Sequence, residues 1–269
     1  MMNTELVITT FQKPNYLNVV LKSLSEQACL PNRVCIADDG SDSSTQSVIE
    51  SFQALNPNMP VRHVWHENLG FRKTAILNEV IRSSRADYLI FTDDDCVMHP
   101  RFIQRHLELA APGQFITGSA IRLEQDFSDK ILRDGKLHWD NNGRPMGWKA
   151  RSRSELLKSM PFNPRLMSVL DTISPVRCSW AGGNASTFRK YILEVNGFDE
   201  SMGYGAEDKE FGARLINMGL KGRHLRYTAP LYHLEHSRGY IDYAQIKKNR
   251  MTLNATRSSG KIRAENGID

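Results

Sequence analysis

The first half of the sequence alternates short apolar runs with helical patterns, and this alternation limits the possible folds more than any other feature. The run 6–11 is apolar and β-branched, and Pro14 then opens a segment with leucines and valines at helical spacing. The same pairing recurs for the strand-like segments 34–37 and 61–65, each followed by a predicted helix, and a fourth apolar run spans 88–92. Strands that alternate with helices form βαβ units. We therefore predict an α/β fold with a Rossmann-like, mostly parallel central sheet flanked by helices.

The second half is less regular. Residues 114–124 are typical of a further strand, whereas 125–177 lack clear periodicity and form either a mobile insertion or an acceptor-side subregion. A helix is predicted to start near Glu207. We divide the chain into a domain over 1–240 and a basic C-terminal tail over 241–269. The domain's three parts are a nucleotide-binding half (1–124), the central segment (125–177) and an acceptor and catalytic half (178–240).

Composition excludes several classes of protein. None of the apolar runs among the 269 residues approaches the roughly 20 needed to cross a bilayer. The start of the chain lacks the basic region of a secretory signal, so we expect a cytoplasmic protein. Cys29, Cys35, Cys96 and Cys178 are too widely spaced for a zinc cluster.

The net charge of +5 is concentrated in the tail, which holds Lys247, Lys248, Arg250, Arg257, Lys261 and Arg263. Such a tail is either solvated or a peripheral contact for anionic lipid on the inner face of the membrane. Aromatic residues of the kind that stack bases are sparse there, so we expect no nucleic acid partner.

Acidic clusters follow two of the predicted strands. Asp93, Asp94 and Asp95 come directly after the run 88–92, and Asp38 and Asp39 come after the run 34–37. Ligands of such sheets bind beyond the carboxyl ends of the strands. Carboxylates two residues apart can share Mg²⁺ or Mn²⁺ and a diphosphate, although a solvated acidic turn is the simpler interpretation. Asp38 and Asp39 either form a capped turn or accept hydrogen bonds from a nucleoside.

Three further groups have a chemical and a structural interpretation. Arg72 and Lys73 open a predicted helix, where they either bind phosphate or lie on the surface. Glu207 and Asp208 suit the first turn of a helix, but a carboxylate there can also act as a general base. The last group is two histidines, His233 and His236, which are either structural or metal ligands.

The order of these motifs resembles known enzymes. The first half is similar to family 2 glycosyltransferases of the GT-A fold, in the stretches 7–11, 37–41, 68–70 and 92–95. The second half resembles the C-terminal part of β-1,4-galactosyltransferases and bacterial polysaccharide polymerases, in the stretches 181–186, 195–199, 204–208 and 236–238. The resemblance covers roughly residues 4–240. It leaves 125–177 unassigned. Tyr204-Gly205-Ala206 also replaces the common Trp-Gly-Gly, so the identity of the donor sugar cannot be inferred from that family.

The resemblance implies a role for each matching residue. Asp208 would be the catalytic base. The acceptor would contact Glu207, Tyr204 and Trp180. The donor nucleotide-sugar would contact Thr9, Phe11, Asp38, Asp39, Arg72, Lys73, Asp93, Asp94, Gly182 and Gly183. Asp95 and His236, with His233 as the alternate, would bind Mn²⁺ or Mg²⁺.

These residues predict an inverting, metal-dependent glycosyltransferase that moves a hexosyl or N-acetylhexosaminyl group. The donor would be a UDP-sugar and the acceptor a saccharide or a lipid-linked oligosaccharide, as in bacterial surface polysaccharide synthesis. A sugar-nucleotide pyrophosphorylase is one alternative, but the glycine-rich basic loop that its chemistry needs after the first strand is missing from Thr9–Lys13. A non-catalytic sugar-nucleotide-binding protein is the other, although such a protein has no need for a base at Asp208.

Overall fold

The computed structural model describes residues 2–141, 143–159, 164–237 and 242–269, and a seven-stranded sheet forms its centre. The spatial order of its strands is β3 (Val61–Trp65), β2 (Arg33–Asp38), β1 (Thr4–Thr10), β4 (Tyr88–Asp93), β8 (Ala185–Phe188), β6 (Gln114–Gly118) and β9 (Lys221–Leu225). All neighbouring strands pair in parallel except β8, which is antiparallel to both β4 and β6. The predicted α/β class with a mostly parallel sheet is therefore confirmed.

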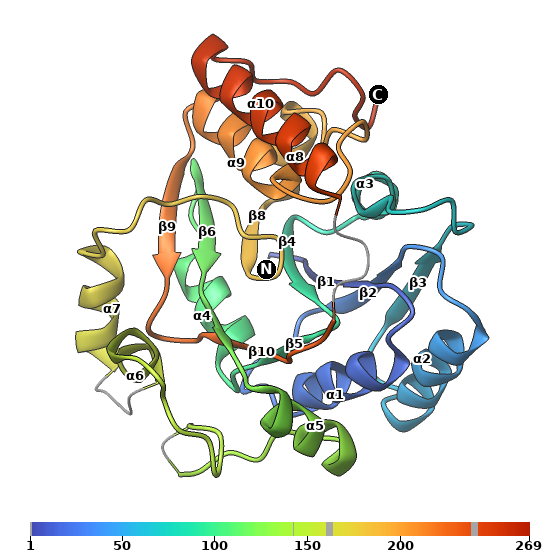
Figure 1. Ribbon diagram of the computed structural model, residues 1–269, viewed down its shortest axis with the longest axis vertical. Helices are drawn as coiled ribbons and strands as arrows, with labels where there is room; N and C mark the ends of the chain where they lie inside the picture. The colour runs from blue at the N-terminus through green and yellow to red at the C-terminus, as the bar shows by residue number, and fades with distance from the viewer. Residues whose placement is uncertain (1, 142, 160–163, 238–241) are drawn as a thin grey trace.

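Helices cover both faces of this sheet (Figure 1). The helices α1 (Pro14–Ser25), α2 (Ser43–Leu55) and α4 (Phe102–Leu109) pack on one face, where residues such as Leu6, Ile8 and Ile90 are fully buried. The other face is covered by α3 (Lys73–Ser83), α8 (Arg189–Glu194) and α9 (Glu207–Asn217), which enclose Val7 and Phe91. Burial on both faces explains why the central strands β2 and β4 are largely apolar rather than alternating.

A second, three-stranded sheet lies beside the first and has the order β5 (Cys96–Met98), β10 (Leu231–His233) and β7 (Ala120–Arg122). The prediction of one strand over 114–124 is wrong, because the chain leaves β6 at Ser119 and enters β7, which belongs to this second sheet. His233 pairs with Cys96 across β10 and β5. The small sheet thus brings the end of the chain's catalytic half next to the acidic residues that follow β4.

The central segment contains three helices, α5 (Gln125–Asp134), α6 (Arg153–Ser159) and α7 (Pro164–Thr172). The helix α5 packs against α1, and its Ile131 shares a buried cluster with Val19. The remaining helix, α10 (Tyr243–Ser259), lies in the predicted basic tail and packs along α9 with Asn249, Leu253 and Thr256 buried. One side of α10 is therefore part of the packed domain, while its basic residues Lys247, Lys248, Arg250 and Arg257 are exposed. None of the helices in the described ranges is both long and apolar enough to span a bilayer.

Candidate active site at the carboxyl edge of the sheet

A pocket of about 420 Å³ lies where β1, β2 and β4 end, between these strand ends, α3, the start of α9 and the end of β10. Most of the site residues predicted from the sequence line it: Thr9, Phe11, Asp39, Lys73, Asp93, Asp94, Asp95, Tyr204, Glu207, Asp208, His233 and His236. They come from segments up to 227 positions apart, from Thr9 to His236 (236 − 9). The parallel strand ends gather them at one edge, as the topology requires.

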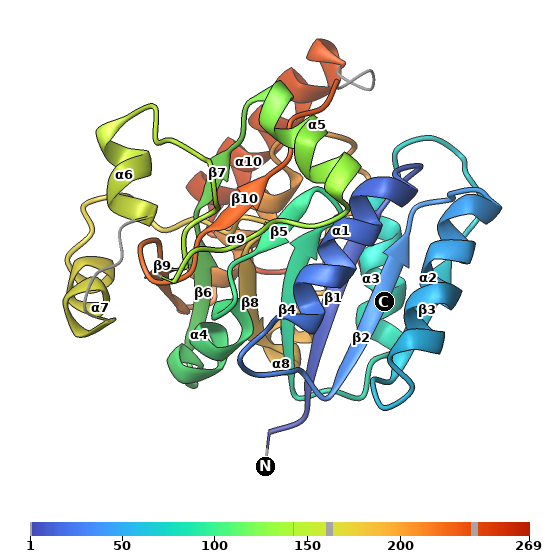
Figure 2. The same cartoon turned by 90° about the horizontal axis from the view of Figure 1, so that it is seen from below.

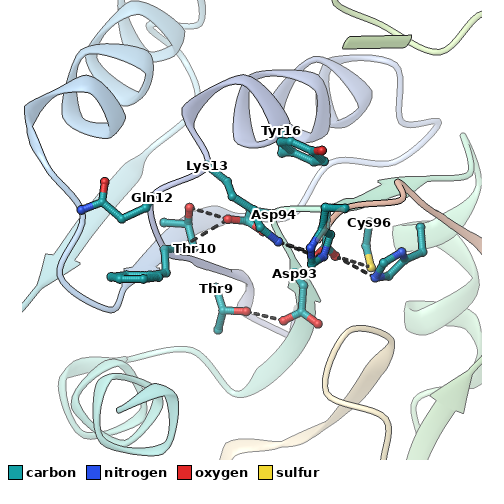
Figure 3. A network of polar contacts seen from close by, with 12 residues as sticks. Thr9, Thr10, Gln12, Lys13, Tyr16, Asp93, Asp94 and Cys96 are labelled. Carbon is teal, nitrogen blue, oxygen red and sulfur yellow. Dashed lines mark hydrogen bonds and ion pairs between the residues drawn. The ribbon is translucent and has the colours of Figure 1, made fainter. Parts of the chain in front are cut away.

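The three consecutive aspartates lie in different environments, and Figure 3 shows Asp93 and Asp94 pointing to different neighbours. Asp93 accepts hydrogen bonds from Thr9 Oγ1 and, over 2.8 Å, from Lys73 Nζ. Asp94 turns toward β1, where Thr10 Oγ1 lies 2.7 Å from its Oδ2. Burial and then the neighbouring Asp95 charge raise the pKa of Asp94 to about 7. A carboxyl that keeps its proton in weak acid reduces the repulsion within the cluster.

Asp95 points to the end of β10 and meets both histidines. Its Oδ2 lies 2.8 Å from His236 Nε2, and its Oδ1 lies 3.6 Å from His233 Nε2. Burial raises the pKa of Asp95, but the hydrogen bond from His236 and the charges of His233 and Lys13 outweigh burial and hold it well below its usual value. Asp95 is therefore ionised throughout the physiological range.

These three side chains fit a divalent cation. One potential ligand atom from each of Asp95, His233 and His236 lies within 4.8 Å of the others, so a single ion can reach all three. Carboxylate oxygen suits Mn²⁺ and Mg²⁺, and imidazole favours a transition metal over Mg²⁺. The sequence left open which histidine would bind; the geometry brings both within reach. The Arg238 of the quoted His-Ser-Arg stretch lies outside the described residues.

Sequence reasoning missed Lys13 at this position. Its Nζ lies 3.1 Å from Asp95 Oδ2 and 2.9 Å from His236 Nε2. Lys13 therefore forms an ion pair with the carboxylate that faces the histidines. The signal was present in the sequence, because Lys13 follows the first strand at the edge where the aspartates lie.

Asp208 and Glu207 occupy the first turn of α9 and face the pocket. Asp208 Oδ2 accepts a 3.2 Å hydrogen bond from the Gly182 amide, while its buried Oδ1 has no hydrogen-bond partner within the part of the chain that the structure describes. Glu207 Oε2 accepts a 2.7 Å hydrogen bond from the Gly205 amide. Burial, opposed by the Lys73 charge, raises the pKa of Asp208, and burial with the Asp208 charge raises that of Glu207 to about 7.

Lys73 is the cation shared by this acidic group. Burial alone would lower its pKa, but Asp93, Asp208 and Glu207 together raise it well above the usual value. The ammonium group is therefore permanently charged, and it stabilises the ionised form of the two carboxylates on α9. Lys73 is also the first residue of α3, whose amino-terminal dipole adds positive potential at the same place.

Gly182 and Gly183 lie behind these carboxylates and are not among the residues that line the pocket. A Cβ at Gly182 would lie 2.4 Å from Asp208 Oδ2, and one at Gly183 would lie 2.7 Å from Asp93 Oδ2. The two glycines thus let the backbone before β8 approach the two carboxylates closely. A direct approach of a donor sugar to this backbone remains a prediction.

Asp38 and Asp39, the acidic pair at the end of β2, have different surroundings. Asp39 lines the pocket, with His66 Nε2 at 2.7 Å from its Oδ1 and the Arg72 amide at 2.9 Å from its Oδ2. Asp38 is fully buried between the Ser41 amide and His63 and does not reach the pocket. Arg72 contributes its backbone amide to Asp39, and its side chain is not part of the lining.

Trp180, which was predicted to contact the acceptor, is not among the residues that line the pocket. Its side chain is 1% exposed and packs edge-on against Phe211 with 4.8 Å between the ring centroids. The aromatic residues of the lining are Phe11, Phe71 and Tyr204, and the rings of Phe71 and Tyr204 are in a T-shaped contact at 5.7 Å. Phe71 was not predicted, because nothing in the sequence near it indicates that it packs against Tyr204.

Two family models match the sequence. Residues 5–179 match the model of glycosyl transferase family 2, and residues 175–237 match a model described as the N-terminal domain of galactosyltransferase. The resemblance inferred from the motifs is therefore confirmed for both halves.

The curated relatives include synthases of bacterial polysaccharides. The chain is 26% identical to the chondroitin synthase of Escherichia coli over 242 residues, which make up 86% of this chain and 34% of that protein. It is 25% identical over 274 residues to the uncharacterized glycosyltransferase YfnE of Bacillus subtilis, across 92% of this chain and 69% of that one. The chain thus spans about a third of the length of the chondroitin synthase.

The solved structures that the chain is similar to share its fold. A mannosyltransferase from Pyrobaculum calidifontis, in complex with GDP-Man and Mn²⁺, superposes with a TM-score of 0.63 at 16% identity, over 96% of this chain and 64% of that one. Staphylococcus aureus TarS in complex with UDP-GlcNAc gives a TM-score of 0.63 at 13% identity, over 96% and 69% of the two chains. These likenesses confirm the predicted GT-A fold.

Proposed function

The chain belongs to glycosyl transferase family 2, and from this premise we propose that it transfers a hexosyl or N-acetylhexosaminyl group from a UDP-sugar to a saccharide or lipid-linked acceptor. The proposed reaction is metal-dependent and inverts the configuration at the anomeric carbon. One observation carries the proposal: Asp208 lines the pocket, and its buried Oδ1 has no hydrogen-bond partner among the described residues. A carboxylate oxygen kept available in this way is suited to take a proton from a bound hydroxyl.

The donor would lie along the ends of β1, β2 and β4. Asp39 can accept a hydrogen bond from the imide N–H of a uracil ring, and its two present partners, His66 and the Arg72 amide, hold it at the pocket wall. Lys73, beside Asp93, supplies positive charge for a diphosphate. The solved relatives bound to UDP-GlcNAc and to GDP-Man support a sugar nucleotide as the donor class.

The residues that fit a divalent cation are Asp95, His233 and His236. A bound Mn²⁺ or Mg²⁺ would neutralise charge on the departing nucleoside diphosphate. Asp95 is ionised and held between the two histidines, so this side of the pocket is preorganised to hold charge while the opposite side carries the base. The structure that contains Mn²⁺ supports this part of the proposal.

The acceptor hydroxyl would bind between Asp208, Glu207 and Tyr204. Asp208 takes the proton as the hydroxyl oxygen forms its bond to the anomeric carbon and the bond to the diphosphate breaks. The raised pKa of Asp208 makes it a stronger base than an exposed aspartate, while the charge of Lys73 favours its ionised form. A single base and no enzyme nucleophile give inversion, because the acceptor attacks from the side opposite the leaving group.

The test is release of UDP by the purified protein from a panel of UDP-sugars, with Mn²⁺ or with EDTA, compared between the wild type and Asp208→Asn. Metal-dependent release from one donor is expected for the wild type. Asp208→Asn should lose at least about a hundredfold in turnover, as expected for a lost general base, while UDP affinity measured by calorimetry stays unchanged. Asp126→Asn is a matched control, because Asp126 is likewise the second residue of its helix but is exposed. Near-wild-type turnover in Asp208→Asn would refute the assignment, and UDP binding without any turnover would favour a non-catalytic binding protein.

A further inference from the structure

An exposed apolar surface lies on α6, α7 and the segment that follows α7. It is formed by six aliphatic side chains, each at least 42% exposed: Leu156, Leu157, Leu166, Val169, Ile173 and Val176. We call this set the α6–α7 apolar surface. Figures 1 and 2 show both helices at the periphery of the molecule, on the far side from β3. Exposed apolar side chains gathered on one short stretch of chain mark an interaction site more often than scattered ones do.

The inner side of the same segment is firmly attached to the protein. Met167 of α7 is buried, and Asp171 accepts hydrogen bonds from the amides of Arg226 and Tyr227 over 2.7 and 2.8 Å and from Thr228 Oγ1 over 2.8 Å. Lys158 of α6 donates to the Ala120 carbonyl of β7 over 3.4 Å. The aliphatic side chains are thus held outward by a segment whose polar groups face the protein.

The charge around this surface is positive. Arg153 and Arg177 are exposed and lie close to the aliphatic residues in the sequence. The acidic groups of the described residues 151–159 and 164–177 are engaged locally: Glu155 pairs with Arg151, and Asp171 is buried. The outward-facing charge therefore complements an anionic partner.

The side-chain chemistry favours lipid over protein as that partner. Protein interfaces gain most of their energy from tryptophan, tyrosine and arginine, whereas leucine and valine are under-represented at their hot spots. Among the described residues 151–159 and 164–177, the large exposed hydrophobic side chains are all aliphatic. Aliphatic residues next to lysine and arginine are instead the pattern of helices that lie in the headgroup region of a membrane.

We propose that the α6–α7 apolar surface docks the protein peripherally on an anionic lipid bilayer. The docking rests on this surface itself; only its purpose, access to a lipid-linked acceptor, depends on the proposed function. The surface also connects structurally to the pocket, because α6 is bonded to β7, β7 pairs with β10, and β10 carries His233 at the pocket wall. Docking would therefore hold the bilayer on the side of the small sheet.

The experiment is co-sedimentation with phosphatidylcholine vesicles, with and without phosphatidylglycerol, and without nucleotide. The wild type should bind the anionic vesicles, and added salt should weaken the binding. Leu156→Ser/Val169→Ser/Ile173→Ser should weaken it at least about tenfold while circular dichroism and donor hydrolysis stay unchanged. Leu30→Ser/Leu55→Ser/Met251→Ser is the control, since these apolar residues are exposed elsewhere, each by at least half. Arg153→Glu/Arg177→Glu tests the charge if the triple variant folds poorly.

Each contrary result overturns the proposal. Failure of the wild type to bind anionic vesicles excludes lipid docking, and unchanged binding of both the triple and the charge variants excludes this surface. Loss of binding only in Lys247→Glu/Lys248→Glu would transfer the contact to α10, whose outer side is also basic. A wild-type dimer in light scattering that the triple variant converts to a monomer would identify a protein interface instead. Because the assay contains no donor, a failed glycosyl transfer leaves this result interpretable.

Discussion

Replacing Lys73 by methionine tests whether the buried charge arrangement controls catalysis. The substitution keeps most of the length of the side chain but removes the ammonium group that lies 2.8 Å from Asp93 Oδ1 and that also acts on Asp208 and Glu207. At this distance and an effective dielectric constant of about 20, one ion pair has a Coulomb energy of ~6 kcal/mol. The desolvation of both groups offsets much of it. We expect a net loss of about 3 kcal/mol in unfolding free energy, the lower end for a broken buried pair, because Lys73 and Asp93 are partly exposed.

The diagnostic effect is on pH dependence. Lys73 lowers the pKa of both Asp208 and Glu207, so its removal raises both. Asp208 must be ionised to act as a base, and the ionised fraction at a given pH falls when its pKa rises. The acidic limb of the profile of kcat/KM against pH should therefore move to higher pH by about one unit, which corresponds to ~1.4 kcal/mol. Activity should recover partly as the pH is raised.

The assay is UDP release at subsaturating donor from about pH 5.5 to about pH 9, a range that brackets the expected limb. Lys209→Met is the control, because Lys209 adjoins Asp208 in sequence but is exposed and is the weakest of the influences on its pKa. This control should shift the limb little. A Lys73→Met enzyme that is slower at every pH but keeps the wild-type acidic limb would refute the argument, and Lys73 would then act only on the donor.

Three further predictions concern other contacts of the site. Asp95→Ala should weaken Mn²⁺ binding, measured by electron paramagnetic resonance, by at least about tenfold; unchanged affinity would exclude Asp95 as a ligand. Gly183→Ala should raise the donor KM, because its new Cβ would lie 2.7 Å from Asp93 Oδ2. It should also lower the unfolding free energy, measured by denaturant titration, by about 1–3 kcal/mol. A wild-type KM would contradict a role of this close approach in donor binding. Asn249→Ala loses the 2.7 Å hydrogen bond to the Gly203 carbonyl. It should raise the acceptor KM and lower the unfolding free energy by about 1–3 kcal/mol, with UDP affinity unchanged. An unchanged acceptor KM would show that α10 only stabilises the fold.

Much of the nucleotide-binding half could be predicted because its signals are local. The strand 61–65 and the helix beginning at Lys73 agree with β3 and α3, since an apolar run and a helical repeat each define their own limits. The grouping of Asp39 and Asp93 followed from strand direction alone. The proposed roles of the site residues remain predictions.

The remaining features depend on contacts between distant segments. The sequence around Trp180 is typical of a loop and does not indicate whether the side chain is buried or exposed. Its burial depends on packing against Phe211, which lies far along the chain. The strand prediction breaks at Ser119 because β6 and β7 belong to two different sheets. The periodicity of a sequence does not show which sheet a strand joins. The α10 helix has a weak apolar face, so its position depends on buried hydrogen bonds such as that from Asn249 rather than on a hydrophobic stripe.

The central segment has one more consequence, which concerns how such proteins diverge. Residues 125–177 begin after β7, which is fixed to β10, and end before β8, which is fixed between β4 and β6. Once both ends of a loop are anchored, doubling its length costs only about 0.6 kcal/mol of closure entropy. Changes in the length of its exposed parts therefore leave the edge that holds Asp95 and Asp208 in place, as long as the contacts of Ile131 and Asp171 are kept. Under the proposed function, the acceptor contacts of this segment can thus change separately from the base and the metal ligands.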